Sequence, residues 1–535
     1  MEPHFALSIG QILRAPVARN PDQLIADGNG RAVTYRQFHN RVDRLARALR
    51  DLGLAQGATV AVMDWDSPRY LECFFAIPMI GATLHTVNIR LSPEQILFTI
   101  NHAEDDAILV HEDFLPLLLP LLPRVVRPVT LILLSDSEGV DLPEGFAGEY
   151  EVLLAQAGGP VSYPDLPETT RATLFYTTGT TGDPKGVSYT HRQLVLHTLA
   201  VTADLGTVPG SGGLKRDDVY MPITPLFHVH GWGFPYVATF LGLKQVYPGR
   251  YDPARLLALV TEHGVTFSHC VPTILAMVLG APQAATTDLT RWKVLIGGSA
   301  LPEGLARQAR SRGIDVHAAY GMSETCPFVT HADMVASQSS DDLSIRTATG
   351  KPAPLVEVRV VDPDMTDVPH DGRTTGEVIA RAPWLTEGYL KNYAARADLW
   401  RGGWLHTGDV GHMAPDGTLR ITDRLKDVIK SGGEWVSSLV LENLASTAPG
   451  VTEVAAVGVP DDRWGERPVL VAVIEGDGAV ETAIRARIMA AIERGELPKW
   501  AAPDRICPVA ALPRTSVGKI DKKRIRQMLE AGEIA

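Results

Sequence analysis

The sequence contains little cysteine. Only four cysteines occur among its 535 residues, and they lie far apart in the chain, at Cys73, Cys270, Cys326 and Cys507. No two of them have the close spacing of metal ligands, and they cannot form the disulfide framework of a small secreted protein. The sequence therefore predicts a protein of a reducing compartment, and we expect the cytoplasm.

Long hydrophobic runs are also missing. The most apolar stretch, residues 114–134, is interrupted by several prolines and by Arg124 and Arg127. A membrane-spanning helix needs about 20 residues nearly free of charge, so we interpret this stretch as a short buried helix followed by a strand over residues 129–134. The first residues, MEPHFALSIGQIL, lack the basic segment and apolar core of a signal peptide. No transmembrane segment is predicted, while contact with a membrane surface stays open.

An excess of positive charge is absent as well. Lysine and arginine number 50 against 62 aspartates and glutamates, which gives a formal net charge of -12. Because nucleic-acid binding relies on basic surface that neutralises phosphate, a general nucleic-acid binder is disfavoured. Hydrophobic residues make up 45% of the chain and charged residues 21%, as in ordinary globular proteins. At about 150 residues a domain, the length predicts two to four domains.

Apolar strands alternate with amphipathic helices over the first 320 residues. Thr34 precedes apolar positions at helical spacing and predicts a capped helix, and a second helix is expected near residues 68–80. Buried strands that alternate with helices indicate parallel sheets with helices on both faces. The expected strands cover residues 59–63, 82–86, 172–176, 265–271, 293–296 and 315–320.

The pattern changes after residue 355. Short alternating strands at residues 357–361, 376–381 and 417–422 predict a small antiparallel β unit. Beyond Arg424 come two strands, at residues 454–459 and 468–474, and a helix near residues 480–494. We therefore expect an α/β protein with a large N-terminal domain, residues 1–424, and a smaller α+β domain, residues 425–535.

A loop rich in glycine and threonine follows the strand at residues 172–176. Residues 176–187 read YTTGTTGDPKGV, in which glycines allow close backbone approach and hydroxyls surround Lys185. This composition suits a polyphosphate, although the loop is not a Walker A motif. It resembles the signature loop of the AMP-forming adenylate superfamily, which contains acyl-CoA synthetases, peptide-synthetase adenylation domains and beetle luciferases. The residues that this resemblance assigns to the phosphates are Thr177, Thr178, Gly179, Thr180, Thr181, Gly182 and Lys185.

Further motifs of this superfamily follow in order. Residues 320–325, YGMSET, follow a predicted strand and resemble the element that places Tyr320 and Gly321 at the adenine, Ser323 near the α-phosphate and Glu324 on Mg²⁺. Carboxylate oxygen suits that hard cation. Residues 404–409, WLHTGD, resemble the element whose aspartate, Asp409 here, accepts hydrogen bonds from both ribose hydroxyls.

Two C-terminal motifs complete the resemblance. Residues 423–427, DRLKD, are similar to the hinge between the two domains, with Arg424 contacting ribose or phosphate and Lys426 as the pivot. Residues 513–523, PRTSVGKIDKK, carry the essential lysine of the superfamily, which is Lys519 here. A cation at this place stabilises the charge that develops as a carboxylate attacks phosphorus. We interpret Lys522 and Lys523 as a solvated helix start.

The stretch MPITPLFHVHGWGFPY, residues 221–236, resembles the fatty-acid branch of the superfamily. In that branch the first histidine, His228 here, lies beside the carboxylate, and the tryptophan, Trp232 here, gates the acyl tunnel. We interpret His230 as an ordinary polar residue within an apolar segment, with no role in the site. The segment GGSALP, residues 297–302, resembles the pocket wall, which assigns Gly297 and Gly298 to the acyl pocket and Gly298 and Ser299 to the nucleotide. SGGEWVSS, residues 431–438, also resembles the fatty-acyl branch.

Together these motifs predict an acid–thiol ligase that uses ATP, Mg²⁺ and coenzyme A. A medium- to long-chain fatty acid would first form an acyl-adenylate and then pass to coenzyme A when the C-terminal domain rotates. An aryl or methylthio-alkanoic acid, or a separate carrier protein as acceptor, stays open, as does a homodimer. Catalysis is assigned to Lys519, Glu324, His228 and Thr177.

Overall fold

The computed structural model describes residues 5–137, 139–159, 161–177, 183–208, 213–336, 342–431, 434–475, 479–495, 497–515 and 519–534. The middle of the predicted phosphate loop, Thr178, Gly179, Thr180, Thr181 and Gly182, lies outside these residues, as do Gly432 and Gly433 of the SGGEWVSS segment. Within the described ranges, none of the helices combines the length and apolar composition that a membrane crossing requires.

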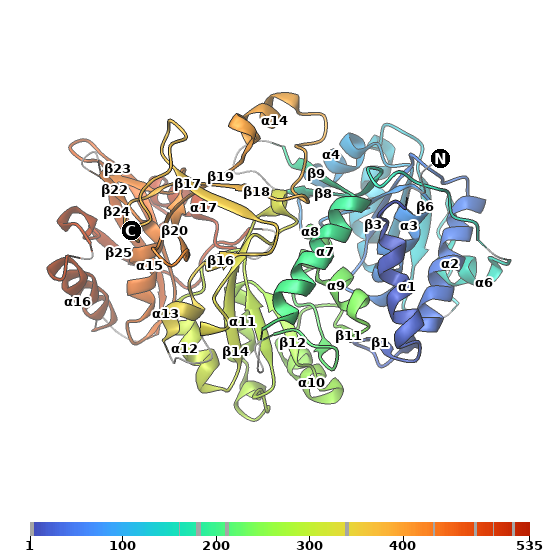
Figure 1. Ribbon diagram of the computed structural model, residues 1–535, viewed down its shortest axis with the longest axis horizontal. Coiled ribbons are helices and arrows are strands. Elements are labelled where there is room, and N and C mark those ends of the chain that lie inside the picture. The colour runs from blue at the N-terminus through green and yellow to red at the C-terminus, as the bar shows by residue number, and fades with distance from the viewer. Residues whose placement is uncertain are drawn as a thin grey trace.

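A seven-stranded sheet forms the N-terminal part of the molecule, at the right of Figure 1. Its strand order is β7-β6-β5-β3-β4-β8-β9, and all neighbours are parallel except the last pair, β8 and β9. The Thr34 side chain accepts a hydrogen bond from the backbone of Gln37 and caps α2, as predicted. The strands are β3 (Thr59–Met63), β4 (Thr83–Thr86), β5 (Ala107–His111), β6 (Thr130–Leu134), β7 (Phe146–Glu149), β8 (Arg171–Thr177) and β9 (Lys185–Thr190), with helices α2 (Tyr35–Asp51), α3 (Pro68–Met79), α4 (Pro93–Ala103), α5 (Leu115–Leu118) and α6 (Tyr150–Gln156).

A nine-stranded sheet lies beside the first one. Its order is β16-β15-β14-β13-β12-β10-β11-β1-β2, with a parallel centre from β14 to β1 and antiparallel strands at both edges. Strands β13 and β14 cover the predicted residues. The strands are β1 (Leu24–Asp27), β2 (Ala32–Thr34), β10 (Val219–Tyr220), β11 (Lys244–Tyr247), β12 (Phe267–Cys270), β13 (Lys293–Ile296), β14 (Asp315–Tyr320), β15 (Thr330–His331) and β16 (Lys351–Pro352).

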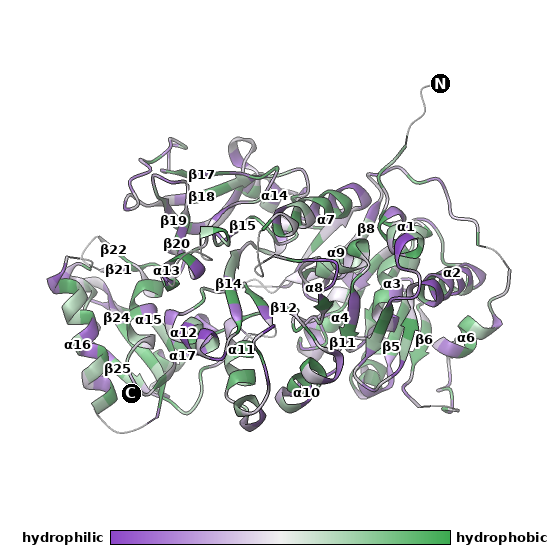
Figure 2. Cartoon of the chain, turned by 60° about the horizontal axis from the view of Figure 1, so that its bottom comes forward, coloured by the Kyte–Doolittle hydropathy of each residue, from purple (hydrophilic) through white to green (hydrophobic). Residues whose placement is uncertain are grey.

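Helices cover these two sheets, and their apolar faces form a large core, while α10, α11 and α12 form a second cluster with strands β13 and β14. In Figure 2 strands β5 and β6 are hydrophobic, whereas α2 at the edge is largely hydrophilic. Helix α1 buries Ile9, Ile12 and Leu13 in this core. The remaining helices of this part are α1 (Ile9–Arg19), α7 (His191–Gly206), α8 (Val229–Trp232), α9 (Phe234–Leu241), α10 (Pro253–His263), α11 (Pro272–Leu279), α12 (Glu303–Ser311) and α13 (Leu343–Arg346).

A four-stranded antiparallel sheet follows, as the alternating pattern predicted. It consists of β17 (Glu357–Val361), β18 (Gly376–Arg381), β19 (Leu405–Met413) and β20 (Leu419–Arg424), and α14 (Tyr393–Leu399) lies between β18 and β19. Strand β19 contains the WLHTGD motif from Leu405 on. Sequence analysis did not predict this strand, because its two glycines and its polar residues interrupt the alternation of apolar and polar positions. The sheet presents Asp409 and Arg424 from paired positions.

The C-terminal residues form an α+β unit with a five-stranded sheet, at the left of Figure 1. Two hydrophobic clusters of its own, one on each face of the β23–β24 pair, hold it together. The segment between Arg424 and Ile429, where β20 ends and β21 begins, contains the predicted domain boundary. The elements are β21 (Ile429–Ser431), β22 (Glu434–Val436), β23 (Val451–Asp461), β24 (Gly465–Ile474), β25 (Arg505–Pro508), α15 (Ser438–Ser446), α16 (Ala479–Glu493) and α17 (Lys522–Glu530).

The stretch at residues 114–128 differs from its prediction. It contains only the one-turn helix α5 and a short 3-10 segment, Leu119–Arg124, because closely spaced prolines remove the hydrogen bonds of a longer helix. The stretch is also only partly buried, since Leu119 is 41% exposed and Val126 is 81% exposed. The strand that follows is present as β6.

Candidate active site

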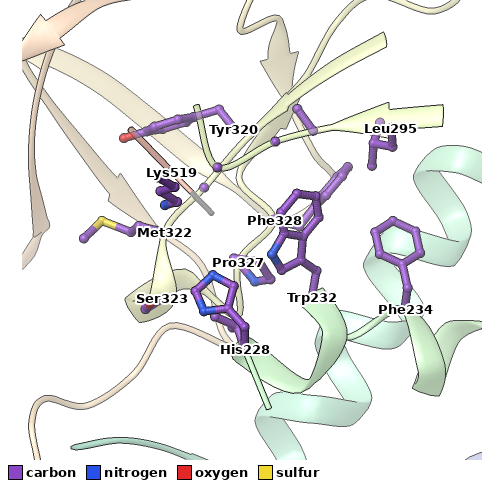
Figure 3. Close-up of a pocket in the computed structure, with 15 residues that line it drawn as sticks. His228, Trp232, Phe234, Leu295, Tyr320, Met322, Ser323, Pro327, Phe328 and Lys519 are labelled. Atoms are coloured by element: carbon purple, nitrogen blue, oxygen red, sulfur yellow. The ribbon is translucent and has the colours of Figure 1, made fainter. Parts of the chain in front are cut away.

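A pocket opens at the carboxyl ends of β13 and β14, the edge at which parallel sheets bind ligands. It has a volume of about 460 Å³ including its open mouth. Figure 3 shows Tyr320, Lys519 and Met322 on one side of Trp232, and Phe234 and Leu295 on the other. The lining residues are His228, Val229, Trp232, Phe234, Leu295, Gly297, Gly298, Ala319, Tyr320, Gly321, Met322, Ser323, Pro327, Phe328 and Lys519.

Tyr320, Asp409 and Arg424 form a connected polar group at one end of this pocket. The Tyr320 hydroxyl donates to Asp409 Oδ2 at 2.7 Å, and Arg424 Nε lies 3.0 Å from Asp409 Oδ1. Burial and the Asp409 carboxylate raise the pKa of Tyr320, so its hydroxyl stays a donor. Each oxygen of a carboxylate accepts more than one hydrogen bond. Asp409 can therefore still accept hydrogen bonds from a diol.

Lys519 reaches this pocket from the C-terminal unit. A Cβ added at Gly298 would lie 3.2 Å from Lys519 Cε, so the glycine makes room for the lysine stem. Burial lowers the pKa of Lys519 to about 8, and the positive charge of Arg424 lowers it as well. Both Lys519 and Arg424 can therefore bring positive charge to a phosphate bound in this pocket.

His228 lines the pocket and directly follows two residues whose backbone is held by hydrogen bonds. The Leu226 amide donates to Asp66 Oδ1 at 2.9 Å, and Thr86 Oγ1 donates to the Phe227 carbonyl at 3.1 Å. Burial lowers the pKa of His228 to about 3, with Lys519 as the next cause. The imidazole is therefore neutral near pH 7, and it can donate one hydrogen bond but carries no charge.

Trp232 projects from a left-handed turn. Residues 229–233 all have positive φ, including Val229 at 48°, His230 at 55° and Trp232 at 59°. Side chains with a Cβ rarely adopt this conformation. The turn brings the indole against Gly297, where an added Cβ would lie 3.1 Å from Trp232 Cη2. Trp232 thereby separates the polar end of the pocket from the apolar end.

Glu324 and Lys185 are joined by Tyr389, which contacts both of them. The Tyr389 hydroxyl donates to Glu324 Oε1 at 2.6 Å, and Lys185 Nζ lies 4.7 Å from the centre of the Tyr389 ring. Thr177 ends β8 opposite Lys185. No group of three or more His, Cys, Asp and Glu side chains could hold a metal ion within the described part of the chain. A cation at Glu324 would therefore take its other ligands from phosphate and water, as Mg²⁺ commonly does.

Three further residues named in the sequence analysis lie outside the pocket lining. Ser299 is exposed and is not among the residues that line the pocket. Lys426 is exposed between β20 and β21. His230 is fully buried behind the pocket, 5.1 Å from the Phe175 ring centre, and burial lowers its pKa to about 3.

The interpretation of Lys522 as solvated is wrong. Its side chain is 15% exposed, lies 2.7 Å from Glu442 Oε1 and donates to Ser438 Oγ at 2.6 Å. Helix α17 packs on β23, and the Lys522 side chain faces α15 rather than water. Lys523, the next residue, is exposed as predicted.

Sequence analysis missed one neighbour of the pocket and seven of its lining residues, because their apolar character alone does not distinguish them from core residues. The missed lining residues are Val229, Phe234, Leu295, Ala319, Met322, Pro327 and Phe328. Tyr389 lies 65 residues from Glu324 in the chain. Its one local signal is the preceding Gly388, which has a φ of 147° and marks a special backbone position.

Two family models match the chain. The model of the AMP-binding enzymes matches residues 13–390, and that of the C-terminal domain of AMP-binding enzymes matches residues 440–519. A long-chain-fatty-acid–CoA ligase of Thermus thermophilus is 39% identical over 510 residues, which cover 94% of this chain and 91% of that protein. A 3-methylmercaptopropionyl-CoA ligase of Ruegeria pomeroyi is 37% identical over 512 residues, covering 94% of this chain and 92% of that protein.

The fold is also found among solved structures. An anthranilate CoA ligase in complex with anthranoyl-AMP superimposes with a TM-score of 0.87 at 22% sequence identity, and the match covers 99% of both chains. At this identity the likeness concerns the fold. The mixed parallel and antiparallel sheets and the smaller C-terminal unit are thus the architecture of the adenylate-forming enzymes, as expected from the sequence.

Proposed function

We propose, from the premise that this chain belongs to the AMP-binding enzyme family, that it activates a medium- to long-chain fatty acid. The chain is an AMP-forming acyl-CoA synthetase, an acid–thiol ligase that uses ATP and coenzyme A. The observation that supports a fatty acid is the apolar end of the pocket behind Trp232, where Phe234, Leu295 and Phe328 offer no charge to a substrate. We also propose that the enzyme works in the cytoplasm.

In the first step the acid attacks the α-phosphorus of ATP, forming the acyl–phosphate bond and expelling pyrophosphate. Tyr320 would lie at the adenine, and Asp409 with Arg424 would hold the ribose. The neutral His228 would donate a hydrogen bond to the acid's carboxylate, while Lys519 offsets charge at the reacting carboxylate and phosphate. Positioning and charge therefore supply the catalysis, with no covalent enzyme intermediate.

Glu324 fits a magnesium ion by its chemistry, because it is a carboxylate whose Oε1 accepts from Tyr389 while Oε2 has no hydrogen bond within the described part of the chain. Thr177 and Lys185 would bind the phosphates beside it. When bound, Mg²⁺ neutralises charge on the phosphates. The protein's own part is to hold Glu324, Ser323 and Lys185 in fixed relation.

In the second step the thiol of coenzyme A displaces AMP from the acyl-adenylate. We propose that residues 425–535 rotate about Lys426, which withdraws Lys519 and admits the thiol. Support comes from the separate hydrophobic clusters of this unit. The hinge segment is held by the Asp423 carboxylate, which accepts from the Ser438 amide at 2.6 Å.

Trp232 would set the length of acid that the pocket accepts. With the indole against Gly297, a short acid fits in front of it, and a longer chain has to displace it. This geometry also supports a second candidate, a short methylthio-alkanoic acid, which needs no movement of Trp232. The Ruegeria relative named for such an acid shares 37% identity with this chain.

Trp232→Ala tests the proposal. We expect the wild-type enzyme to form AMP and thioester with coenzyme A alone, with the highest kcat/KM among acids of six to sixteen carbons. The variant should change the ratio of kcat/KM for palmitate over butyrate at least about tenfold, because each buried methylene is worth about 1–3 kcal/mol, and leave the KM for ATP unchanged. The assay measures AMP release with acetate, butyrate, octanoate, palmitate, benzoate and 3-methylthiopropionate.

Trp500→Ala, at a tryptophan 37% exposed on the C-terminal unit, is the matched control and should behave as wild type. Equal effects of Trp232→Ala on butyrate and palmitate contradict the gate. A wild-type maximum at 3-methylthiopropionate replaces the fatty acid with the second candidate. Pyrophosphate release without thioester makes a carrier protein the acceptor.

The pH dependence of adenylate formation should report on Lys519. Its pKa is lowered to about 8, so the charged form is lost as the pH rises through that value. We expect the rate of pyrophosphate release to fall above about pH 8, whereas an ordinary lysine would keep its charge to about pH 10. The rate of thioester formation from supplied acyl-adenylate, measured over the same range, should lack this fall. A flat profile of pyrophosphate release to pH 10 contradicts the role of Lys519.

A further inference from the structure

Tyr389 occupies a position between two charged groups of opposite sign. Its hydroxyl donates to Glu324 Oε1 at 2.6 Å, and its ring lies 4.7 Å from Lys185 Nζ. A phenol hydroxyl carries its proton at neutral pH and therefore donates this hydrogen bond. A single rigid side chain thus contacts both the carboxylate and the ammonium group.

The backbone around Tyr389 is fixed to the same two elements. Tyr389 pairs with Val187 of β9, and the Leu390 amide donates to the Gly186 carbonyl at 2.8 Å. Thr386, three residues earlier, donates its amide to the Glu324 carbonyl at 3.0 Å. The segment from Thr386 to Leu390 is therefore attached to the strand that carries Lys185 and to the turn that carries Glu324.

Side chains of neighbouring elements donate further hydrogen bonds to the backbone on both sides of this contact. Gln193 Nε2 donates to the Leu385 carbonyl at 2.7 Å, and Trp400 Nε1 donates to the Thr386 carbonyl at 3.0 Å. The Tyr189 hydroxyl of β9 donates to the Ser323 carbonyl at 2.6 Å. Because backbone and side-chain hydrogen bonds hold both ends, the phenol ring has little freedom to leave its place between the charges.

The Tyr389 hydroxyl also decides which part of Glu324 is open to a ligand. It engages Oε1 and so fixes the rotation of the carboxylate. Oε2 has no hydrogen bond from the described residues, so it is the oxygen that a bound cation would take. A cation–π contact on the ring holds the Lys185 ammonium at a set height above the phenol. The result is a fixed separation between a carboxylate for a cation and an ammonium group for a phosphate.

We infer that Tyr389 is a positioning residue that fixes Glu324 relative to Lys185, so that a divalent cation and the polyphosphate it accompanies bind as one unit. The inference rests on the proposed assignment of Glu324 to the cation and of Lys185 to phosphate. It assigns Tyr389 no contact with the reacting atoms. Its effect is on the affinity for the metal–nucleotide complex rather than on the nucleoside end of the site.

Tyr389→Phe removes the hydroxyl and keeps the ring, and is the direct test. Binding is measured without acid or coenzyme A, by titrating Mn²⁺ with ATP and following free Mn²⁺ by electron paramagnetic resonance, and by calorimetry of AMP alone. We expect the variant to weaken Mn²⁺ binding in the presence of ATP about tenfold and to bind AMP as wild type does. In turnover, the Mg²⁺ concentration at half-maximal rate should rise by a similar factor.

The matched control is Tyr393→Phe, at a tyrosine 83% exposed four residues further along the chain. It should leave both titrations unchanged. Tyr389→Leu, which also removes the ring below Lys185, should weaken Mn²⁺–ATP more than Tyr389→Phe does. Unchanged Mn²⁺ binding in Tyr389→Phe, or equal weakening of AMP, overturns the inference, whatever happens to the melting temperature.

Glu324→Gln separates this inference from the function it rests on. If Glu324→Gln weakens Mn²⁺ binding and Tyr389→Phe does not, only the role of Tyr389 fails. If Glu324→Gln leaves Mn²⁺ binding unchanged, the proposed cation site itself fails, and the inference about Tyr389 is overturned with it.

Discussion

Replacing Lys519 with alanine should reduce acyl-adenylate formation by at least about 100-fold, the loss seen when one group that stabilises transition-state charge is removed. Lys519 lies in the pocket beside Gly298, and in the proposed mechanism its charge faces the point where the acid meets the phosphate. Thioester formation from chemically supplied acyl-adenylate should proceed at close to the wild-type rate, because the proposed rotation withdraws this lysine before the thiol attacks. Single-turnover pyrophosphate release and thioester formation measure the two steps separately.

Lys523→Ala is the control for this experiment. Lys523 is exposed, lies in the same motif and carries the same charge, so the variant should keep both steps. If Lys519→Ala still forms adenylate with ATP, the catalytic assignment fails. If it loses both steps equally, Lys519 serves both half-reactions and the rotation about Lys426 loses its support.

Gly321→Ala should have the second large effect, on folding of the site itself. A Cβ at this position would lie 1.4 Å from the Pro327 carbonyl oxygen, and a backbone carbonyl cannot move aside as a flexible side chain can. Overpacking typically costs 1–3 kcal/mol and occasionally more. Because this overlap is with backbone, we expect a loss above about 3 kcal/mol in the free energy of unfolding, measured by urea denaturation, together with loss of ATP binding.

Gly206→Ala provides the comparison. Gly206 ends α7, has no positive φ, and an added Cβ there would meet no atom within 4 Å. This variant should be at least as stable as wild type, since alanine is favoured over glycine in a helix by about 0.5–1 kcal/mol. Wild-type stability and ATP binding in Gly321→Ala would show that the turn after β14 can relax, contrary to the packing described.

The sequence pattern was enough to predict short strands whose central residues are buried. Strands β13 and β14 lie at the predicted residues, and the Thr34 cap of α2 is present, because local side-chain chemistry determines these features. The elements that were missed depend on distant partners. Helix α1 is recognisable only by the core that buries Ile9 and Leu13, and β19 is a strand because β18 and β20 pair with it.

In the candidate site, too, local motifs were predicted, whereas residues that depend on distant partners were missed. The resemblance to the superfamily assigned Tyr320, Gly298 and Lys519 to one site, and they line one pocket although they come from three separate segments. Tyr389 could not be found in this way, because its importance arises from contacts with Lys185 and Glu324, 204 and 65 residues away. Lys522 was misread for the same reason, since only the docking of α17 shows that its charge meets Glu442.

The left-handed turn at residues 229–233 has a consequence for how this enzyme can change over evolutionary time. Each non-glycine residue in that conformation stores about 1–2 kcal/mol that the surrounding structure must repay. Val229, His230 and Trp232 each add to this stored strain. If Trp232 gates the acyl pocket as proposed, substitutions in the packing that restrains the turn alter the range of acids without touching a nucleotide contact. Thermal stability and substrate range would then evolve together, because the same packing residues determine both.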